Sequence, residues 1–383
     1  PIAVLRSSVV KQVKGGLPRC LRDLLRLANS RQGQGFVLQL PTGSRIVKMT
    51  CKNNLGDESA LNNGLSFKGA SGLLPCISCK NVAMKGKKRN ASDYIQEISC
   101  AEPALFDQRT NEDFEDAYKL CTNKRSRLSN PKFEELERQL GLNYNCHGII
   151  GDESLRDFIS VADSLTYDAM HTYFQSGVVN AEMTLVLSRL KASGIKWTSV
   201  ETFFKADFAF PGHWKRNYDS LHECFNEARE KSSKKVFKAG ASEMLGIVPV
   251  FNHFLVLLPE PVKTTMADVV ACFNKLNACI QLYKQAKGAV ENDGDDGCHT
   301  MLADKWMLAE KDHQATFCEV YGANKVKPKH HYRLHLPKQF QRDGIVLDCF
   351  PCERFYKVQK HAARNFKNTT QFEKSVLANT LFK

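Results

Sequence analysis

Hydrophobic residues recur with the period of an α-helix along most of this chain, and they alternate with polar residues only in short runs near its ends. The segment 17–28 has the helical period. The runs 36–40 and 45–51 flank a Pro-Thr-Gly-Ser turn, which predicts a β-hairpin. From 111 to 323 strand patterns are nearly absent. We expect helices there at 111–121, 131–140, 152–162, 167–192, 198–205, 215–230, 240–257, 264–287 and 299–321.

Strand and helix signals return together near the end of the chain. The run 344–348 predicts a short strand, and Pro351 precedes a helix over 352–367, a position that proline favours. Because this last strand needs partners from the first part of the chain, we expect an α/β core interrupted by a large all-α insertion. The first part of the core, a cysteine-containing loop region, the insertion and the last part of the core would be 1–72, 73–110, 111–323 and 324–383.

Composition narrows the class of protein. The 383 residues, 43% of them hydrophobic, suffice for a sizeable core. No segment approaches the roughly 18 uninterrupted apolar residues of a membrane span, and no secretory signal pattern is present, so we expect no membrane partner. Fourteen cysteines are scattered along the chain, and Cys272, Cys279 and Cys318 fall in apolar helical patterns. This distribution favours reduced thiols in an intracellular protein over disulfides.

The distribution of charge is more informative than the net charge of +13. Residues 1–56 carry ten Lys and Arg against one acid, and residues 324–383 carry thirteen against four, so each end has a net charge of +9. The middle of the chain is slightly acidic, at −5. Such asymmetry favours a polyanion, such as a nucleic acid, bound by a surface that both ends build. A generic solvated basic surface is the alternative.

One face of the helix expected after Pro351 combines a carboxylate with cations. Glu353, Lys357, Lys360 and Arg364 follow one another at helical spacing, and Arg354 adjoins them. A carboxylate that holds a metal ion beside cations that contact phosphates is typical of metal-dependent chemistry on DNA. An exposed face stabilised by Glu–Lys pairs is the alternative. The apolar side chains at 355, 358, 362 and 366 fall on another face, which we expect to pack on a sheet.

Two further acidic positions are candidates for chemistry. Asp57 follows the strand pattern and precedes a short helical stretch, so it is either a site carboxylate at the end of a strand or a helix N-cap. Asp168 and His171 are three residues apart on an expected helix, which places them side by side. They could share a hydrogen bond, a metal ion or a DNA contact, or they could be a buried polar pair that fixes the helix.

The pair Cys76-x-x-Cys79 has the spacing of half a zinc site. Its completion is open: Cys349 and Cys352, or Cys100, or Cys146 with His147, could supply the other ligands. Buried free cysteines are the alternative. No GxSxG, Walker, GxGxxG or HExxH pattern is present, so hydrolase triads, NTPases, dinucleotide enzymes and zincins have no local support.

Taken together, these residues resemble the CACTA-type superfamily of DDE transposases. The segment 164–171, ending in Asp168-Ala-Met-His171, is similar to the D-x-M-H segment of that family. The segments 327–336, 344–346, 353–355 and 372–376 are similar to its ending, with a Glu-Arg-Phe helix before a Glu-x-Ser segment. Asp57, the Gly-rich turn 69–72 and the cysteine pair are similar to its second catalytic Asp, Gly-rich turn and Cys pair, in the same order.

The resemblance implies an RNase H-like core that cleaves and transfers DNA strands with two Mg²⁺ or Mn²⁺ ions. Asp57 would be the second catalytic and metal-binding acid and Glu353 the third, with Asp168 and His171 as the signature pair of the insertion. The family also needs a first Asp on the first strand. Residues 1–56 contain only Asp23, in a helical pattern, so we expect that strand to lie before Pro1 and this chain to be inactive as given.

The same resemblance implies a nuclear protein that assembles as a homo-oligomer on transposon ends. Two alternatives come from other classes of protein. One is a non-catalytic DNA-binding protein, adapted by its host, that keeps the scaffold and the basic face. The other is a zinc-stabilised helical interaction module with no nucleic-acid role.

Overall fold

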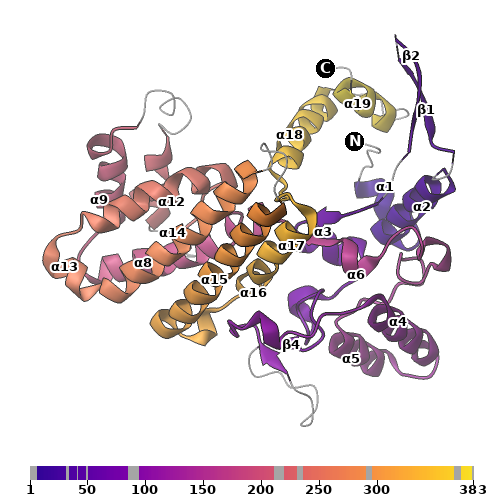
Figure 1. Ribbon diagram of the computed structural model, residues 1–383, viewed down its shortest axis with the longest axis horizontal. Coiled ribbons are helices and arrows are strands. Elements are labelled where there is room, and N and C mark those ends of the chain that lie inside the picture. The colour runs from indigo at the N-terminus through magenta and orange to yellow at the C-terminus, as the bar shows by residue number, and fades with distance from the viewer. Residues whose placement is uncertain are drawn as a thin grey trace.

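The computed structural model of this chain is shown in Figure 1. It describes residues 7–31, 34–40, 42–48, 51–84, 95–210, 220–230, 236–289, 296–365 and 372–381. The described part is mostly helical, and its strands form three sheets of two strands each. None of the described helices combines the length and the apolarity that crossing a lipid bilayer requires.

A block of long helices forms the orange half of the molecule in Figure 1. The helices α12 (Ala241–Val256), α14 (Ala267–Gly288) and α15 (Asp296–Tyr321) fall where the apolar periodicity predicts helices, and α14 packs along α15. Buried aromatic side chains fill the space between the helices, because three helices that face one another must each bury an apolar stripe. The largest fully buried ones include Trp306, Phe251, Phe273 and Phe317.

The other elements are shorter. In the first part of the chain they are α1 (Ser7–Gln12), α2 (Gly16–Ser30), α3 (Glu58–Gly64), η1 (Gly69–Ser71), β4 (Val82–Ala83), β5 (Gln96–Glu97), η2 (Pro103–Leu105), α4 (Asn111–Arg125) and α5 (Asn130–Leu140). In the rest they are η3 (Glu153–Leu155), α6 (Val161–Ser164), α9 (Trp197–Thr202), η4 (Phe203–Asp207), η5 (Leu221–Phe225), α11 (Glu227–Glu230), α13 (Glu260–Thr265), η7 (Ala323–Lys325), α16 (Pro328–Tyr332), η8 (Arg333–His335) and α17 (Leu336–Asp343).

The expected hairpin is present as β1 (Phe36–Leu40) and β2 (Gly43–Val47), which pair antiparallel. It pairs with no other strand of the described chain, and all five residues of β2 are exposed. The hairpin therefore projects from the rest of the protein, as Figure 1 shows, and it is not part of the sheet that contains β3.

A parallel pair of strands joins two distant parts of the chain. Strand β3 (Asn54–Gly56) pairs with β6 (Leu165–Tyr167), about 110 residues further along. The sequence predicts a helix over 167–192, but the structure places β6, α7 (Ala169–Tyr173) and α8 (Val178–Ala192) in this region. The helix is interrupted at Ser176, which has a φ of 52°, and at Gly177.

Replacing Gly177 with alanine should lower the free energy of unfolding by about 2 kcal/mol, because the site has no room for a side chain. A Cβ atom at this position would lie 2.3 Å from the carbonyl oxygen of Thr172. The control is Gly288→Ala near the end of α14, where a Cβ meets nothing within 4 Å and a small gain in stability is expected. Urea unfolding measures both, and equal effects would contradict the close approach at Gly177.

The last part of the chain departs from the predicted strand and sheet packing. Helix α17 ends at Asp343 and is capped by Gly344, which has a φ of 69°, and residues 345–349 are irregular rather than a strand. Helix α18 (Phe350–Asn365) then packs on α19 (Phe372–Leu381). Its apolar face meets no sheet, because Phe355 is 40% and Val358 is 44% exposed, although Ala362 is buried. Residue 366 lies outside the described residues.

Candidate metal centre

Two cysteines and two histidines meet in the interior of the protein. Cys76 and Cys79 face His331 and His335, and all four residues are buried. One ligand atom from each, the two sulfurs and two ring nitrogens, lies within 4.8 Å of the other three. These residue types in this number form a Cys2His2 set, which could bind a metal ion such as zinc.

The two halves of the set come from segments 259 residues apart. The cysteines lie in the irregular segment between η1 and β4, where Cys79 also forms a β-bridge with Gln108. The histidines lie four residues apart on the helical run α16–η8–α17, so they share one face. Pro337 is the second residue of α17, and the turn before that helix is a 3₁₀ helix, which suits a proline that cannot donate to the preceding turn.

The spacing of the ligand atoms matches a tetrahedron around a zinc ion. Bonds of about 2.3 Å to sulfur and about 2.0 Å to nitrogen give sulfur–nitrogen edges of about 3.5 Å and nitrogen–nitrogen edges of about 3.3 Å. In the structure, His335 Nε2 lies 3.4 Å from Cys76 Sγ and 3.5 Å from Cys79 Sγ. The Nε2 atoms of His331 and His335 lie 3.2 Å apart. The three edges that meet at His335 therefore match a tetrahedral zinc ion, and all four ligand atoms lie within 4.8 Å of one another.

The electrostatics of the cluster favour ionisation of one thiol, that of Cys76, while burial and the neighbouring Cys76 raise the pKa of the other thiol, that of Cys79. Burial opposes ionisation of Cys76, but its hydrogen bond with Cys79 and the nearby His331 and His335 outweigh that effect and lower its pKa well below the usual range. Burial lowers the pKa of His331, which favours the neutral imidazole that binds metals. A thiolate and neutral imidazoles are the forms in which these side chains act as ligands.

Neighbouring side chains hold the cluster in place. The hydroxyl of Tyr167, the last residue of β6, lies 3.3 Å from Cys76 Sγ and accepts a hydrogen bond from the backbone N–H of Ile77. Its ring stacks on His335 with the centroids 5.4 Å apart. Arg109 donates to the carbonyl oxygen of Cys79. The candidate metal centre is thus built onto the end of β6.

The structure brings the predicted half-site together with two histidines that the sequence did not lead us to expect there. Cys349 is buried beside Asp168, whereas Cys352 and Cys146 are exposed and Cys100 is half-buried elsewhere, so none of them completes the set. The second half of the site could have been predicted from the sequence, because His331-x-x-x-His335 has the usual histidine spacing of a Cys2His2 site. All fourteen cysteines are free thiols.

Next to this centre, an aspartate directly follows each of the strands β3 and β6. Asp57 follows β3 and Asp168 follows β6, and the carboxyl ends of parallel neighbours lie at the same edge of a sheet. Both residues are also helix N-caps. Asp57 accepts from the N–H of Ala60 at 2.6 Å and its side chain is 38% exposed. Asp168 caps α7 and its side chain is fully buried.

Asp168 is surrounded by hydrogen-bond donors. The N–H groups of Met170 and Cys349 donate to its Oδ1 at 3.0 and 2.8 Å, while the N–H of His171 donates to its Oδ2 at 3.2 Å. Its Oδ2 also bonds to Nδ1 of His171, so the pair predicted to be neighbours is hydrogen-bonded. Burial raises the pKa of Asp168, but these bonds outweigh burial and lower it overall.

His171 points from Asp168 towards Asp57. Its Nε2 lies 3.9 Å from Oδ2 of Asp57, and both residues line a cavity of about 470 Å³. Glu58 and Lys329 line the same cavity, and burial lowers the pKa of Lys329. Because Lys329 lies on α16, two residues before the metal-site His331, the cavity and the metal centre are built on one helix.

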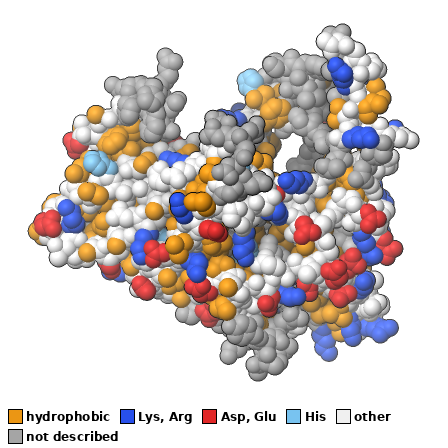
Figure 2. All heavy atoms as spheres, viewed as in Figure 1, with side chains coloured by type: hydrophobic (Ala, Val, Ile, Leu, Met, Phe, Trp, Pro, Cys, Tyr) orange, Lys and Arg blue, Asp and Glu red, His pale blue; other side chains and the backbone are white. Residues whose placement is uncertain are grey.

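The structure places Glu353 near this edge without bringing its carboxylate into contact with Asp57. Its backbone N–H donates to the carbonyl oxygen of Cys349 at 2.8 Å, and the backbone N–H of Cys349 in turn donates to Asp168. The candidate DNA-binding residues of α18 are all exposed; they are Arg354, Lys357, Lys360 and Arg364. In the upper right of Figure 2, over the hairpin, the coloured charged side chains are basic, whereas acidic ones gather lower, towards α4.

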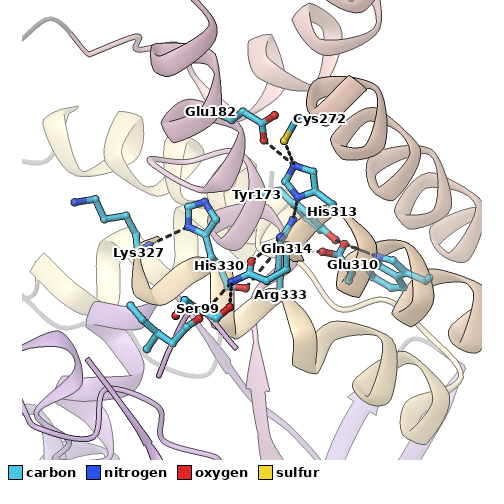
Figure 3. Close-up of polar contacts among 12 residues, drawn as sticks. Ser99, Tyr173, Glu182, Cys272, Glu310, His313, Gln314, Lys327, His330 and Arg333 are labelled. Carbon is cyan, nitrogen blue, oxygen red and sulfur yellow. Dashed lines mark hydrogen bonds and ion pairs between the residues drawn. The ribbon is translucent and has the colours of Figure 1, made fainter. Parts of the chain in front are cut away.

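A second buried polar cluster lies on the other side of the helix that carries the metal-site histidines (Figure 3). Arg333 contacts Glu310 at 3.2 Å and Gln314 at 2.7 Å, and it also donates to Nδ1 of His313. Nε2 of His313 lies 2.7 Å from Glu182. Since a guanidinium can only donate, Nδ1 of His313 must accept and Nε2 must carry the proton that bonds Glu182.

That assignment argues against a metal ion at this second cluster, although Glu182, Cys272 and His313 lie close enough together. A metal ion at this cluster would bind through a lone pair on Nε2 of His313. Nε2 has no free lone pair, because it carries the proton of the ring. Burial also raises the pKa of the Cys272 thiol far above its usual value. We therefore interpret this cluster as a hydrogen-bonded network that joins α8, α14 and α15 to the helix of the metal centre.

Comparisons with known proteins leave the residues themselves as the guide to function. No protein-family model matches this chain, and a search of the curated proteins finds no matching relative.

Proposed function

We propose that this protein cleaves and transfers DNA strands with Mg²⁺ or Mn²⁺ ions, in the manner of DDE transposases, at the edge formed by Asp57 and Asp168. The observation that carries the proposal is the parallel pairing of β3 with β6, which sets a carboxylate at the end of each of two adjacent strands. Carboxylates brought together in this way bind hard divalent cations, and two such ions activate the attacking oxygen and stabilise the leaving one.

This proposal assigns the acids differently from the family resemblance alone. Asp57 would be the first acid and Asp168 the second, with Glu353 as the third, so no acid before Pro1 is required. Glu353 lies in the first turn of α18, whose start is tied to Asp168 through Cys349. An RNase H-like core, a nuclear location and assembly of copies on transposon ends belong to the same proposal.

The Cys2His2 centre would hold zinc in a structural role. All four ligands come from the protein, which leaves no open position for a substrate, and that is the arrangement of structural sites. Bound zinc would fix the segment of Cys76 against the helix of His331. The same helix places Lys329 in the cavity that Asp57 also lines. By holding that helix in position, the ion would stabilise the sheet edge at which Asp57 and Asp168 lie.

Cleavage of labelled DNA in Mn²⁺ or Mg²⁺ tests the enzyme proposal. We expect the wild-type chain to cut, and Asp57→Asn and Glu353→Gln each to lose about 100-fold or more of the rate. Asparagine is as good an N-cap as aspartate, so Asp57→Asn keeps helix α3. The control is Glu319→Gln, an exposed acid of α15, which should leave the rate unchanged. Equal rates in all variants, or no cutting by the wild type, would reject the enzyme proposal.

A second candidate function, a non-catalytic DNA-binding scaffold, is favoured by the environment of Asp168. Its two oxygens already accept from four donors, and its side chain is fully buried, so a metal ion would have to displace existing bonds. This candidate predicts binding without cutting. Binding should weaken with salt, and replacing Lys357, Lys360 and Arg364 with glutamine should reduce the slope of log K against log salt by about 0.9 per lost phosphate contact.

A further inference from the structure

A small pocket lies between the metal centre and α17. It has a volume of about 130 Å³ and is lined by polar and cationic side chains, together with Phe114, Ala162 and Leu165. The polar and cationic ones are Ser78, Gln108, Arg109, His335, Lys338, Gln339 and Arg342. No carboxylate is among its lining residues. The pocket is well below the roughly 300 Å³ of sites that enclose whole drug-sized ligands, so it suits a single chemical group.

Two of the three cations that line the pocket lack a carboxylate partner in the described chain. Arg342 forms an ion pair with Asp343 at 2.7 Å, which offsets its charge. Lys338 is exposed and forms no ion pair with a described residue. Arg109 is only 8% exposed, and it donates to the carbonyl oxygens of Cys79 and Leu140 rather than to an acid.

Arg109 makes the pocket a candidate site for an anion. A buried cation is costly unless a negative charge offsets it, and carbonyl oxygens supply only partial charges. A zinc ion with two thiolates and two neutral imidazoles has no net charge, so the filled metal centre would not offset Arg109 either. The carboxylate of Asp113 acts on Arg109 without forming an ion pair with it, so an anion in the pocket would supply a close counter-charge.

We propose that this pocket binds a phosphate group, with Arg109 and Lys338 as its cationic ligands. A tetrahedral oxyanion fits the size of the pocket, and its oxygens accept hydrogen bonds from guanidinium, ammonium and the hydroxyl of Ser78. The group could be free inorganic phosphate or a phosphate of the DNA backbone. The inference that the phosphate group belongs to DNA rests on the proposed function. Binding of inorganic phosphate does not, because it requires neither Asp57 nor DNA cleavage.

Calorimetric titration of the full zinc-loaded chain with inorganic phosphate, at constant ionic strength, tests the proposal. Lys338→Glu should weaken binding about tenfold or more, whereas Lys325→Glu, which makes the same charge change at an exposed position outside the pocket, should not. Because Lys338 is exposed, both variants should keep the thermal stability of the wild type without phosphate. Undetectable binding to the wild type, or equal binding to both variants, would overturn the proposal.

A second arm identifies the source of the phosphate group. If it belongs to DNA, Lys338→Glu should also bind a short duplex more weakly than Lys325→Glu does, and inorganic phosphate should compete with the duplex for the wild type. If the two variants bind DNA equally, the pocket takes the free ion. Asp57→Asn should retain phosphate binding in either case, so a failure of the cleavage proposal would be distinguishable from a failure of this one.

Discussion

Replacing Cys79 with serine should remove bound zinc and lower the free energy of unfolding by several kcal/mol, on the scale of about 10 kcal/mol that a structural zinc ion contributes in small domains. The reason is the connection that the ion makes. Cys79 and His335 are 256 residues apart in sequence, and the ligands are buried, so losing the ion separates two distant segments and leaves unpaired polar groups in the core.

Elemental analysis and urea unfolding measure the two consequences. Wild-type protein should hold one zinc ion per chain, and Cys79→Ser and His335→Gln should hold much less and unfold at lower urea. The control is Cys352→Ser, because Cys352 is exposed and outside the cluster. If wild-type protein holds no zinc and a strong chelator leaves its unfolding midpoint unchanged, the four residues are a set of buried free side chains.

The long helices α12, α14 and α15 could be predicted because their apolar faces are long and periodic, whereas the helix expected over 152–162 is present only as the short elements η3 and α6. A helix such as α14 buries one stripe along its whole length, and that stripe is visible in any sequence. Strand β6 was missed for the opposite reason. It has three residues, all buried, and a short apolar run without alternation does not distinguish a buried strand from the start of a helix.

The candidate site could be predicted only in halves. Cys76-x-x-Cys79 and Asp168-x-x-His171 are local spacings, and each pair is close together in the structure. The partner of each half lies far along the chain. The cysteines meet His331 and His335 where Tyr332 of α16 stacks on Tyr167 of β6. Asp57 and Asp168 lie on either side of His171 because β3 pairs with β6. Both arrangements therefore depend on the strand that the pattern did not reveal.

Replacing Arg333 with methionine should destabilise the protein by about 3–5 kcal/mol, the usual cost of removing one partner from a buried ion pair. Arg333 is fully buried and is the cation that faces Glu310, whose other oxygen already bonds to Tyr173 and to Trp306. Without the guanidinium, Glu310 would be a buried carboxylate without a counter-charge. The control is Arg354→Met on the exposed face of α18, which should cost less than about 0.5 kcal/mol.

The position of Arg333 links this cost to the metal centre. Arg333 lies between His331 and His335 on the same helical run but points to the opposite side, into the network of Figure 3. Arg333→Met should therefore also release zinc to a chelator faster than the wild type does. Combining it with Glu310→Gln should restore part of the lost stability, because the pair is then neutral on both sides. If Arg333→Met unfolds at the same urea concentration as Arg354→Met, the network does not anchor the helix, and the metal centre must be held by its own ligands alone.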